Sequence, residues 1–199
     1  MPGEQGMNRR EKNRTDRRTK YTRNLIKEVL MAFLKERRFE TITVTEICRR
    51  AEINRGTFYL HYLDTYNVLE DLVDDFLSET TDTVQHVLCP QQSSCTHSLC
   101  SRIQSSEKYW PLLMDDTAAA QVLNKLMENG KSGFSGYLMQ NSSLTKDQAE
   151  AVFAFQINGC LAINRMMIQN RTADWQKIQA AVDQYIRAGL ECLSKNDDF

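Results

Sequence analysis

Proline and glycine are scarce in this chain, and long uninterrupted apolar runs are missing. Its 199 residues include only 3 Pro and 8 Gly, too few for a turn-rich β protein. No strand-like alternation of useful length and no internal repeat occurs. The longest apolar run, residues 151–168, contains Gln, Asn and Arg, which a membrane span rarely tolerates. The sequence therefore predicts an all-α fold, with this run as a helix buried in protein.

The first residues also lack the apolar stretch of a secretory leader. We therefore expect the 6 cysteines to be reduced thiols, because a chain of this length can form a stable core without disulfide bonds. We therefore expect a cytoplasmic protein. No nucleophile–base pair, carboxylate pair or phosphate loop stands out, so we expect no catalytic residue, no cofactor and no resident metal.

Charge of opposite sign dominates the two parts of the chain. Residues 1–64 carry 15 Lys and Arg against 9 Asp and Glu, whereas the remainder carries 10 against 17. A basic head on an acidic body suggests that the head alone binds a polyanion. Residues 1–18 have no apolar periodicity, and we expect a disordered basic arm there.

Apolar residues at helical spacing mark the elements that follow. Thr43 and Glu46 fit a capping box at the start of the second helix. After a three-residue turn, Asn54 is a natural N-cap for the third helix, and Asp64 or Thr65 can cap a fourth. Including these, we expect helices near residues 19–35, 43–51, 54–62, 65–86, 96–106, 108–115, 117–140, 145–169 and 173–194.

The segment INRGTFYLHY, residues 53–62, contains few apolar side chains that could belong to a core. On a helical wheel, Phe58 and Tyr62 share one side and can pack on the two preceding helices. A short helix, a turn and a second short helix form the helix-turn-helix plan, whose second helix enters the DNA major groove. The polar excess is then a reading surface made by Gly56, Thr57, Leu60 and His61, with Arg55 and Tyr59 beside it.

The stretch TVTEICRRAEINRGTFYLHYLDTYNVLEDLV, residues 43–73, resembles the N-terminal domain of TetR-type (TetR/AcrR family) transcriptional regulators. The strong match covers roughly residues 19–77. It is carried by Thr43, Val44, Ile47, Asn54, Gly56, Thr57, Phe58, Tyr59, His61 and Tyr62. The resemblance implies a three-helix DNA-binding domain at residues 19–64 and a helical effector-binding and dimerisation domain at residues 65–199.

The same resemblance implies a homodimer that binds a palindromic double-stranded DNA operator, in most members as a repressor. It also implies that a small apolar or amphipathic effector releases the protein from the DNA. The expected DNA contacts are Arg17, Lys20, Thr43, Thr45, Asn54, Arg55, Gly56, Thr57, Tyr59, Leu60, His61, Tyr62 and Thr65.

Three positions depart from the family pattern. Glu52 stands where a Gly often takes a left-handed conformation, at a cost of roughly 1 kcal/mol. Cys48 replaces a small Ala, and we interpret it as core packing rather than a redox switch. Thr65 replaces a Lys that commonly contacts phosphate. The free N–H groups at the start of that helix can still hold a phosphate beside Thr65, although the contact is weaker.

The C-terminal body offers two sets of candidates, beside the alternative that these residues are simply core. Aromatic and Met side chains with a few polar anchors suit an effector pocket: Tyr109, Trp110, Met114, Phe134, Tyr137, Phe155, Gln156 and Asn164. The last two helices are apolar on more than one side, as expected for a dimer interface: Ile157, Gly159, Cys160, Ile163, Met167, Tyr185, Ile186 and Gly189.

Two other functions remain open on the sequence alone. The Thr65 departure suggests a co-regulator that keeps the fold but binds other proteins. The segment CPQQSSCTHSLC, residues 89–100, suggests a metal or thiol sensor that would use Cys89, Cys95, His97 and Cys100, although its spacing fits no standard zinc site.

Overall fold

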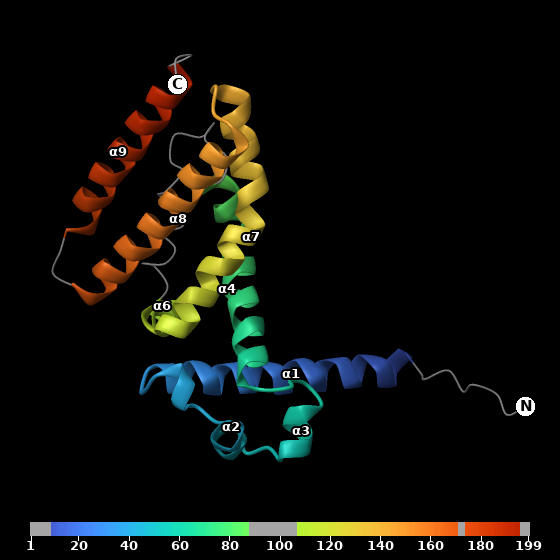
Figure 1. Cartoon of the computed structure of the whole chain (residues 1–199). Helices are drawn as coiled ribbons and strands as arrows, with labels where there is room; N and C mark the ends of the chain where they lie inside the picture. Colours follow the sequence, from blue (N-terminus) through green and yellow to red (C-terminus); the bar gives the residue numbers. More distant parts are fainter. Residues whose placement is uncertain (1–8, 88–106, 171–173, 196–199) are drawn as a thin grey trace, which may run out of the picture. The chain divides into compact units, whose positions relative to one another are not determined.

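The structure is a computed structural model that describes residues 9–87, 107–170 and 174–195 (Figure 1). Every regular element in these ranges is a helix, which confirms the predicted all-α class. The chain divides into two compact units, with the boundary between Leu72 and Val73. The boundary therefore falls inside helix α4 (Thr65–Val87), whereas the sequence analysis places it before Thr65.

The first unit, called unit 1 below, holds three helices and the first two turns of α4. The helices are α1 (Arg9–Leu34), α2 (Val44–Arg50) and α3 (Arg55–Tyr59), with a short 3-10 turn, η1 (Phe39–Thr41), between α1 and α2. Helix α2 packs against both α1 and α3. The centre of the core consists of side chains that are fully buried: Ile26, Leu30, Ile47, Phe58, Val68 and Leu69.

Helix α1 begins ten residues earlier than the sequence analysis places it. Residues 9–18 were expected in a disordered arm, but they form the first turns of α1. The expectation is wrong for these residues because Arg, Lys and Glu are good helix formers. Once the apolar part of α1 is helical, adding a turn needs no new nucleus and no apolar stripe. The rest of the expected arm, residues 1–8, lies outside the described residues.

The second unit, unit 2, continues from Val73 through the later helices. These are the short turn η2 (Glu107–Tyr109), α6 (Trp110–Met114), α7 (Asp116–Asn141), α8 (Lys146–Gln169) and α9 (Trp175–Lys195). Local signals explain two of the starts: the Asp115 carboxylate accepts the Ala118 N–H, and Thr145 and Gln148 form a capping box. The helix expected at residues 96–106 lies outside the described residues.

Helix α8 packs along α7 and contributes the middle of the unit 2 core. Phe153 is almost fully buried, and its ring lies 5.3 Å from that of Phe134 on α7.

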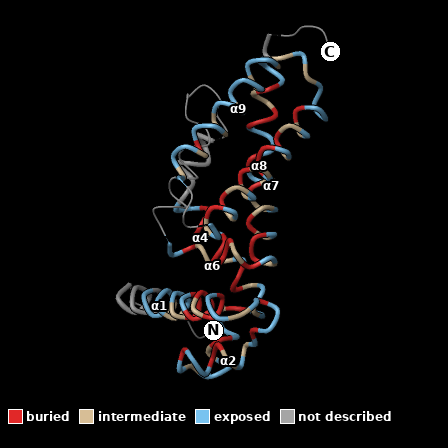
Figure 2. The backbone as a smooth tube through the Cα atoms, turned by 90° about the vertical axis from the view of Figure 1, so that its left-hand side faces the viewer, coloured by how far each residue is buried: buried red, intermediate tan, exposed pale blue. Residues whose placement is uncertain are grey.

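By length and composition α8 is apolar enough to cross a membrane. A core helix passes the same test, and the buried amides of Gln156 and Asn164 on α8 fit a core helix better, because polar groups are costly in lipid. Figure 2 shows the buried stretches of α7 and α8 and the largely exposed α9.

Candidate nucleic-acid interface

The turn between α2 and α3 has the conformation that a helix-turn-helix needs. Thr43 caps α2, since its hydroxyl accepts the Glu46 N–H at 3.3 Å while the Glu46 carboxylate accepts the Thr43 N–H at 3.1 Å. After α2, Glu52 has a φ of 53° and is the only residue other than Gly with a positive φ among those described. Both the capping box and the left-handed position therefore agree with the structure.

Helix α3 starts at a side-chain cap as well. The side-chain Oδ1 of Asn54 accepts the Thr57 N–H at 2.7 Å. A Cβ added to Gly56 would lie 3.2 Å from this same oxygen, so a larger residue there would disturb the cap. Phe58 is fully buried and anchors α3 on the core, which fixes the direction of the opposite face.

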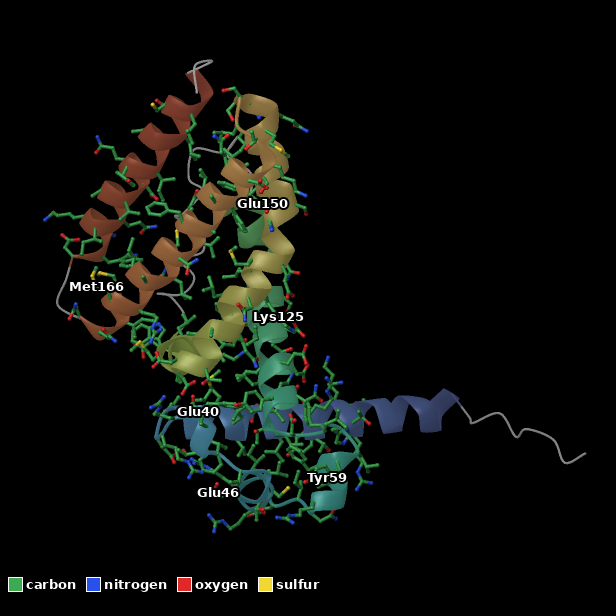
Figure 3. The ribbon with its side chains drawn as sticks, viewed as in Figure 1. Glu40, Glu46, Tyr59, Lys125, Glu150 and Met166 are labelled. Carbon is green, nitrogen blue, oxygen red and sulfur yellow. The ribbon has the colours of Figure 1, made fainter. Side chains whose placement is uncertain are left out.

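The opposite face of α3 is exposed, as the helical wheel predicts. Asn54, Arg55, Gly56, Tyr59 and Leu60 are all exposed, and Thr57 and His61 are partly so. Figure 3 labels Tyr59 on α3 and Glu46 on α2. The exposed side chains supply a cation, hydroxyls, an amide and an imidazole, which together can bond phosphates and base edges.

Arg55 connects the starts of α3 and α2. Its guanidinium donates a short hydrogen bond to the Thr45 hydroxyl, and both side chains are exposed. An arginine held in this way is partly oriented before any anion arrives, so it loses less side-chain entropy on binding. Thr43 is less available, because its hydroxyl donates to Glu46 at 2.7 Å.

Tyr62 differs from the other predicted contacts because it is buried, with 3% of its surface exposed. Its hydroxyl donates to Asp71 at 2.5 Å and lies 3.4 Å from the Arg23 Nε, while the Arg23 guanidinium covers its ring. Asp71 also pairs with Arg23 at 3.0 Å and with Lys27 at 3.3 Å. This brace of Arg23, Lys27, Tyr62 and Asp71 joins α1, the residues that follow α3, and α4.

The charges of the brace stabilise each other. Burial alone would raise the pKa of Asp71, but the hydrogen bonds from Tyr62 and Arg23 and the charge of Lys27 lower it below its usual value. Burial and the bond to Asp71 raise the pKa of Tyr62, so its hydroxyl keeps its proton and remains a donor. Sequence reasoning missed Asp71 and Lys27. The available signal was a tyrosine at a core position, whose hydroxyl requires a partner.

The start of α4 holds a carboxylate. Asp64 accepts the Asn67 N–H at 2.8 Å, so a negative charge already occupies the helix end that the sequence analysis offers to a phosphate beside Thr65. Both would compete for the same N–H groups. We therefore expect the phosphate contact at Thr65 to be weaker still, so that cations elsewhere in unit 1, among them those of α1, would have to attract the phosphates. Of these, Arg17, Arg18 and Lys20 are exposed.

Cys48 lies in the core of unit 1, with 5% of its surface exposed. Burial raises the pKa of its thiol, which keeps it protonated and poorly reactive. This agrees with the interpretation of Cys48 as core packing. The segment with Cys89, Cys95, His97 and Cys100 lies outside the described residues, and no cluster of metal-ligating side chains occurs within residues 9–87, 107–170 and 174–195.

The effector candidates of unit 2 do not gather in one place. Tyr109 and Phe134 are buried in ring contacts, with Phe76 and Phe153 respectively. Burial raises the pKa of Tyr109 to about 12, although Lys108 donates to its hydroxyl at 2.8 Å. Trp110, Met114 and Tyr137 are half-buried.

A small cavity of about 10 Å³ lies between α4, α6, α7 and α8 in unit 2. Asn164 is the one effector candidate at its wall, and Ile157 and Cys160 from the dimer set line it too. Its volume suits a single water molecule rather than a ligand.

A much larger apolar groove, of about 690 Å³, runs between α8 and α9. Phe155 and Gln156, expected at an effector site, line this groove. So do six of the eight dimer candidates: Gly159, Cys160, Ile163, Tyr185, Ile186 and Gly189. Ile157 and Met167 are instead buried within unit 2. Val152, Val182, Leu190 and Leu193 also line the groove; of these, sequence reasoning missed Leu190.

These features define an all-α protein with a helix-turn-helix unit and a separate helical body. No family model matches the chain. Over 50 residues it is 42% identical to an uncharacterized HTH-type transcriptional regulator, YxbF, of Bacillus subtilis (strain 168). The matched part is 25% of this chain and spans only 13% of the length of that relative.

Among solved structures, the chain is similar to the TetR family repressor AlkX from Dietzia sp. strain DQ12-45-1b, a protein implicated in the biodegradation of n-alkanes. The TM-score is 0.51 at 11% identity, over 87% of this chain and 97% of that one. The chain therefore has the TetR-type fold, and the resemblance to this class of regulators is confirmed at the level of the fold.

Proposed function

We propose that this protein is a cytoplasmic transcriptional regulator of the TetR type, which binds double-stranded DNA through α3. The observation that carries the proposal is the geometry of the α2–turn–α3 segment. Both helices are capped, Phe58 fixes α3 on the core, and the face with Arg55, Thr57 and Tyr59 is left outward. A capped, anchored helix with a polar outer face is what insertion into a major groove requires.

The distribution of charge supports DNA as the partner. Residues 1–64 carry the excess of Lys and Arg, and Arg17, Arg18 and Lys20 of α1 are exposed. Phosphate contacts by such side chains release counterions and supply most of the affinity that does not depend on sequence. Arg23 is a weaker candidate for a phosphate contact, because it already pairs with Asp71.

Homodimerisation is supported by the groove between α8 and α9. Phe155 and Tyr185 line it and expose 70% and 69% of their surfaces. A second copy that covers this groove would bury them in a four-helix bundle about a two-fold axis. The two recognition helices would then read half-sites about 34–36 Å apart in a palindromic operator.

We further propose that binding represses transcription and that a small apolar or amphipathic molecule relieves it. Known ligand pockets measure roughly 300–1,000 Å³, whereas the internal cavity of unit 2 measures about 10 Å³. An effector bound inside the core of unit 2 would therefore have to widen the space around Asn164 by moving α7 or α8. If the effector binds the widened state more tightly and DNA binds the closed state more tightly, effector binding would weaken DNA binding.

The test is selection of binding sites by the full chain from a random duplex pool at low salt, followed by sequencing. The proposal predicts an enriched inverted repeat whose half-sites are centred about one helical turn apart. Arg55→Ala should enrich the repeat weakly or not at all. Arg38→Ala, which removes an exposed cation outside the α2–α3 segment, is the matched control and should enrich the same repeat.

One observation favours a second function. The Asp64 carboxylate at the start of α4 opposes a phosphate where TetR-type regulators commonly place a Lys. A co-regulator that has kept the fold and binds other proteins would tolerate this charge. It would enrich no duplex in the selection, and a wild-type chain that enriches none would favour it.

A further inference from the structure

Two leucines lie at the end of α3 and just after it in unit 1. Leu60 and Leu63 each expose 81% of their surface, more than any other large apolar side chain in the described part of the chain. A single exposed leucine is ordinary. Here two occur within four residues, after Tyr59 at 54% exposure. Exposed apolar groups that lie together often mark an interaction site, and the position of each leucine relative to α3 decides whether DNA could contact it.

Leu60 has a position on α3 from which a base edge can be reached. Its N–H donates to the Gly56 carbonyl at 3.1 Å, so Leu60 lies one helical turn after Gly56 and on the same face. Gly56 has no side chain to cover that face. The buried Phe58 lies on the other side of the helix. The methyl groups of Leu60 are therefore accessible along the face that would enter the groove.

Leu63 lacks this placement. Helix α3 ends at Tyr59 with Leu60 as its C-cap, and Leu63 follows three residues later, directly before the Asp64 cap of α4. It is as exposed as Leu60 but lies outside the helix that would enter the groove. The two leucines thus form a matched pair of equal exposure and different location.

The chemistry of the major groove limits what a leucine can recognise there. A leucine makes no hydrogen bond, so base edges that present only donors and acceptors give it nothing to bind. The one apolar group on a base edge in the major groove is the 5-methyl group of thymine. The neighbouring polar side chains Thr57 and His61 can satisfy donors and acceptors beside it.

We propose that Leu60 reads the 5-methyl group of a thymine in each half-site of the operator, and so determines sequence specificity. This inference rests on the proposed DNA-binding function. Removing one buried methyl group weakens an apolar contact by roughly fourfold. Replacing the contacted thymine by uracil, which keeps every hydrogen-bonding group, should therefore lower the affinity about fourfold for each half-site.

The experiment uses the full chain and the duplex enriched by the selection, in versions that carry uracil at one thymine position at a time in both half-sites. Affinity is measured by fluorescence anisotropy for the wild type, Leu60→Ala and Leu63→Ala. The wild type and Leu63→Ala should share one uracil-sensitive position. Leu60→Ala should bind the unmodified duplex more weakly and lose sensitivity at that position, while circular dichroism shows an unchanged helix content.

Two results would overturn the inference. In one, no uracil substitution lowers the affinity of the wild type for the enriched duplex. In the other, Leu60→Ala keeps the full uracil penalty, so that another residue reads the methyl group. Both leave the proposed DNA binding intact. A selection that enriches no duplex would instead remove the proposed function itself, and the role of Leu60 with it.

Discussion

The two units treat their apolar side chains differently. Unit 1 closes its core around fully buried residues such as Ile26, Leu30 and Phe58, and its helix α3 presents mostly polar groups to the outside. Unit 2 buries one side of α8, yet leaves Phe155 and Tyr185 exposed along the groove with α9. Unit 1 thus has a closed core and exposes two leucines, Leu60 and Leu63, at the end of α3, whereas unit 2 carries an apolar groove that a second copy would cover. Each prediction below tests one side of this contrast.

The largest effect is expected where the core of unit 1 is broken. Phe58→Ala removes a fully buried ring that anchors α3 and should lower the free energy of unfolding by about 3–5 kcal/mol. Denaturant unfolding followed by circular dichroism measures this loss. Leu60→Ala, two residues away and 81% exposed, should change it by less than about 0.5 kcal/mol. Similar losses in both variants would contradict the closed core.

The next effect concerns the groove of unit 2. Phe155→Glu places a charge on a side chain that is 70% exposed in the single chain, so the fold should tolerate it. If a second copy covers the groove, the dissociation constant of the dimer should rise at least about 30-fold, as expected for an interface hot spot of about 2 kcal/mol. Analytical ultracentrifugation over a concentration series measures this change. Met139→Glu, at an exposed site on α7 outside the groove, is the control, and equal weakening by both would refute the assignment.

A smaller and pH-dependent effect is expected at the brace around Tyr62. The pKa of Asp71 is lower in the folded protein than its ordinary value of 3.8. The ionised carboxylate therefore stabilises the folded protein at any pH above 3.8. This stabilisation is lost as the pH falls through the lower pKa of the folded state. Asp71→Asn should destabilise the protein by about 1–3 kcal/mol at pH 7, with a smaller difference from wild type in strong acid. Tyr62→Phe should lose less. Unfolding curves at several pH values test this, and a difference that stays constant into acid would exclude the ion pairs as its source.

The smallest effect separates stability from recognition at one residue. Asn54→Ala removes the cap of α3 and should cost about 1 kcal/mol. Asn54→Asp keeps a capping oxygen and the stability, but it adds a negative charge on the face expected to meet phosphates. Its affinity for the enriched duplex should therefore fall while its unfolding midpoint stays near that of the wild type. Unchanged affinity in Asn54→Asp would show that this end of α3 is far from DNA.

The helix-turn-helix was predictable because its signals are local. Thr43 with Glu46, Asn54 with Thr57, and the position of Glu52 each involve residues within a few positions of one another, and the structure contains all three features. The helical period also separates the buried Phe58 from the exposed side of α3.

The remaining features depend on contacts between distant parts of the chain, which a single sequence does not reveal. Asp71 is paired with Arg23, 48 positions away in the sequence. Periodicity marks α8 as apolar on more than one side, but it does not say which side meets α7 and which lines the groove. For this reason the sequence alone does not distinguish the groove residue Phe155 from the buried residue Ile157. The early start of α1 was missed because a charged helix extension carries no apolar pattern.

The central claim, that unit 1 reads DNA sequence, is tested most directly by the salt dependence of binding. The affinity of the full chain is measured by anisotropy for the enriched inverted repeat and for a shuffled duplex of equal composition, between 50 and about 200 mM salt. The account predicts that both affinities fall steeply with salt and that the repeat is bound at least about 10³-fold more tightly. Equal affinity for the two duplexes, or binding that does not change with salt, would contradict it.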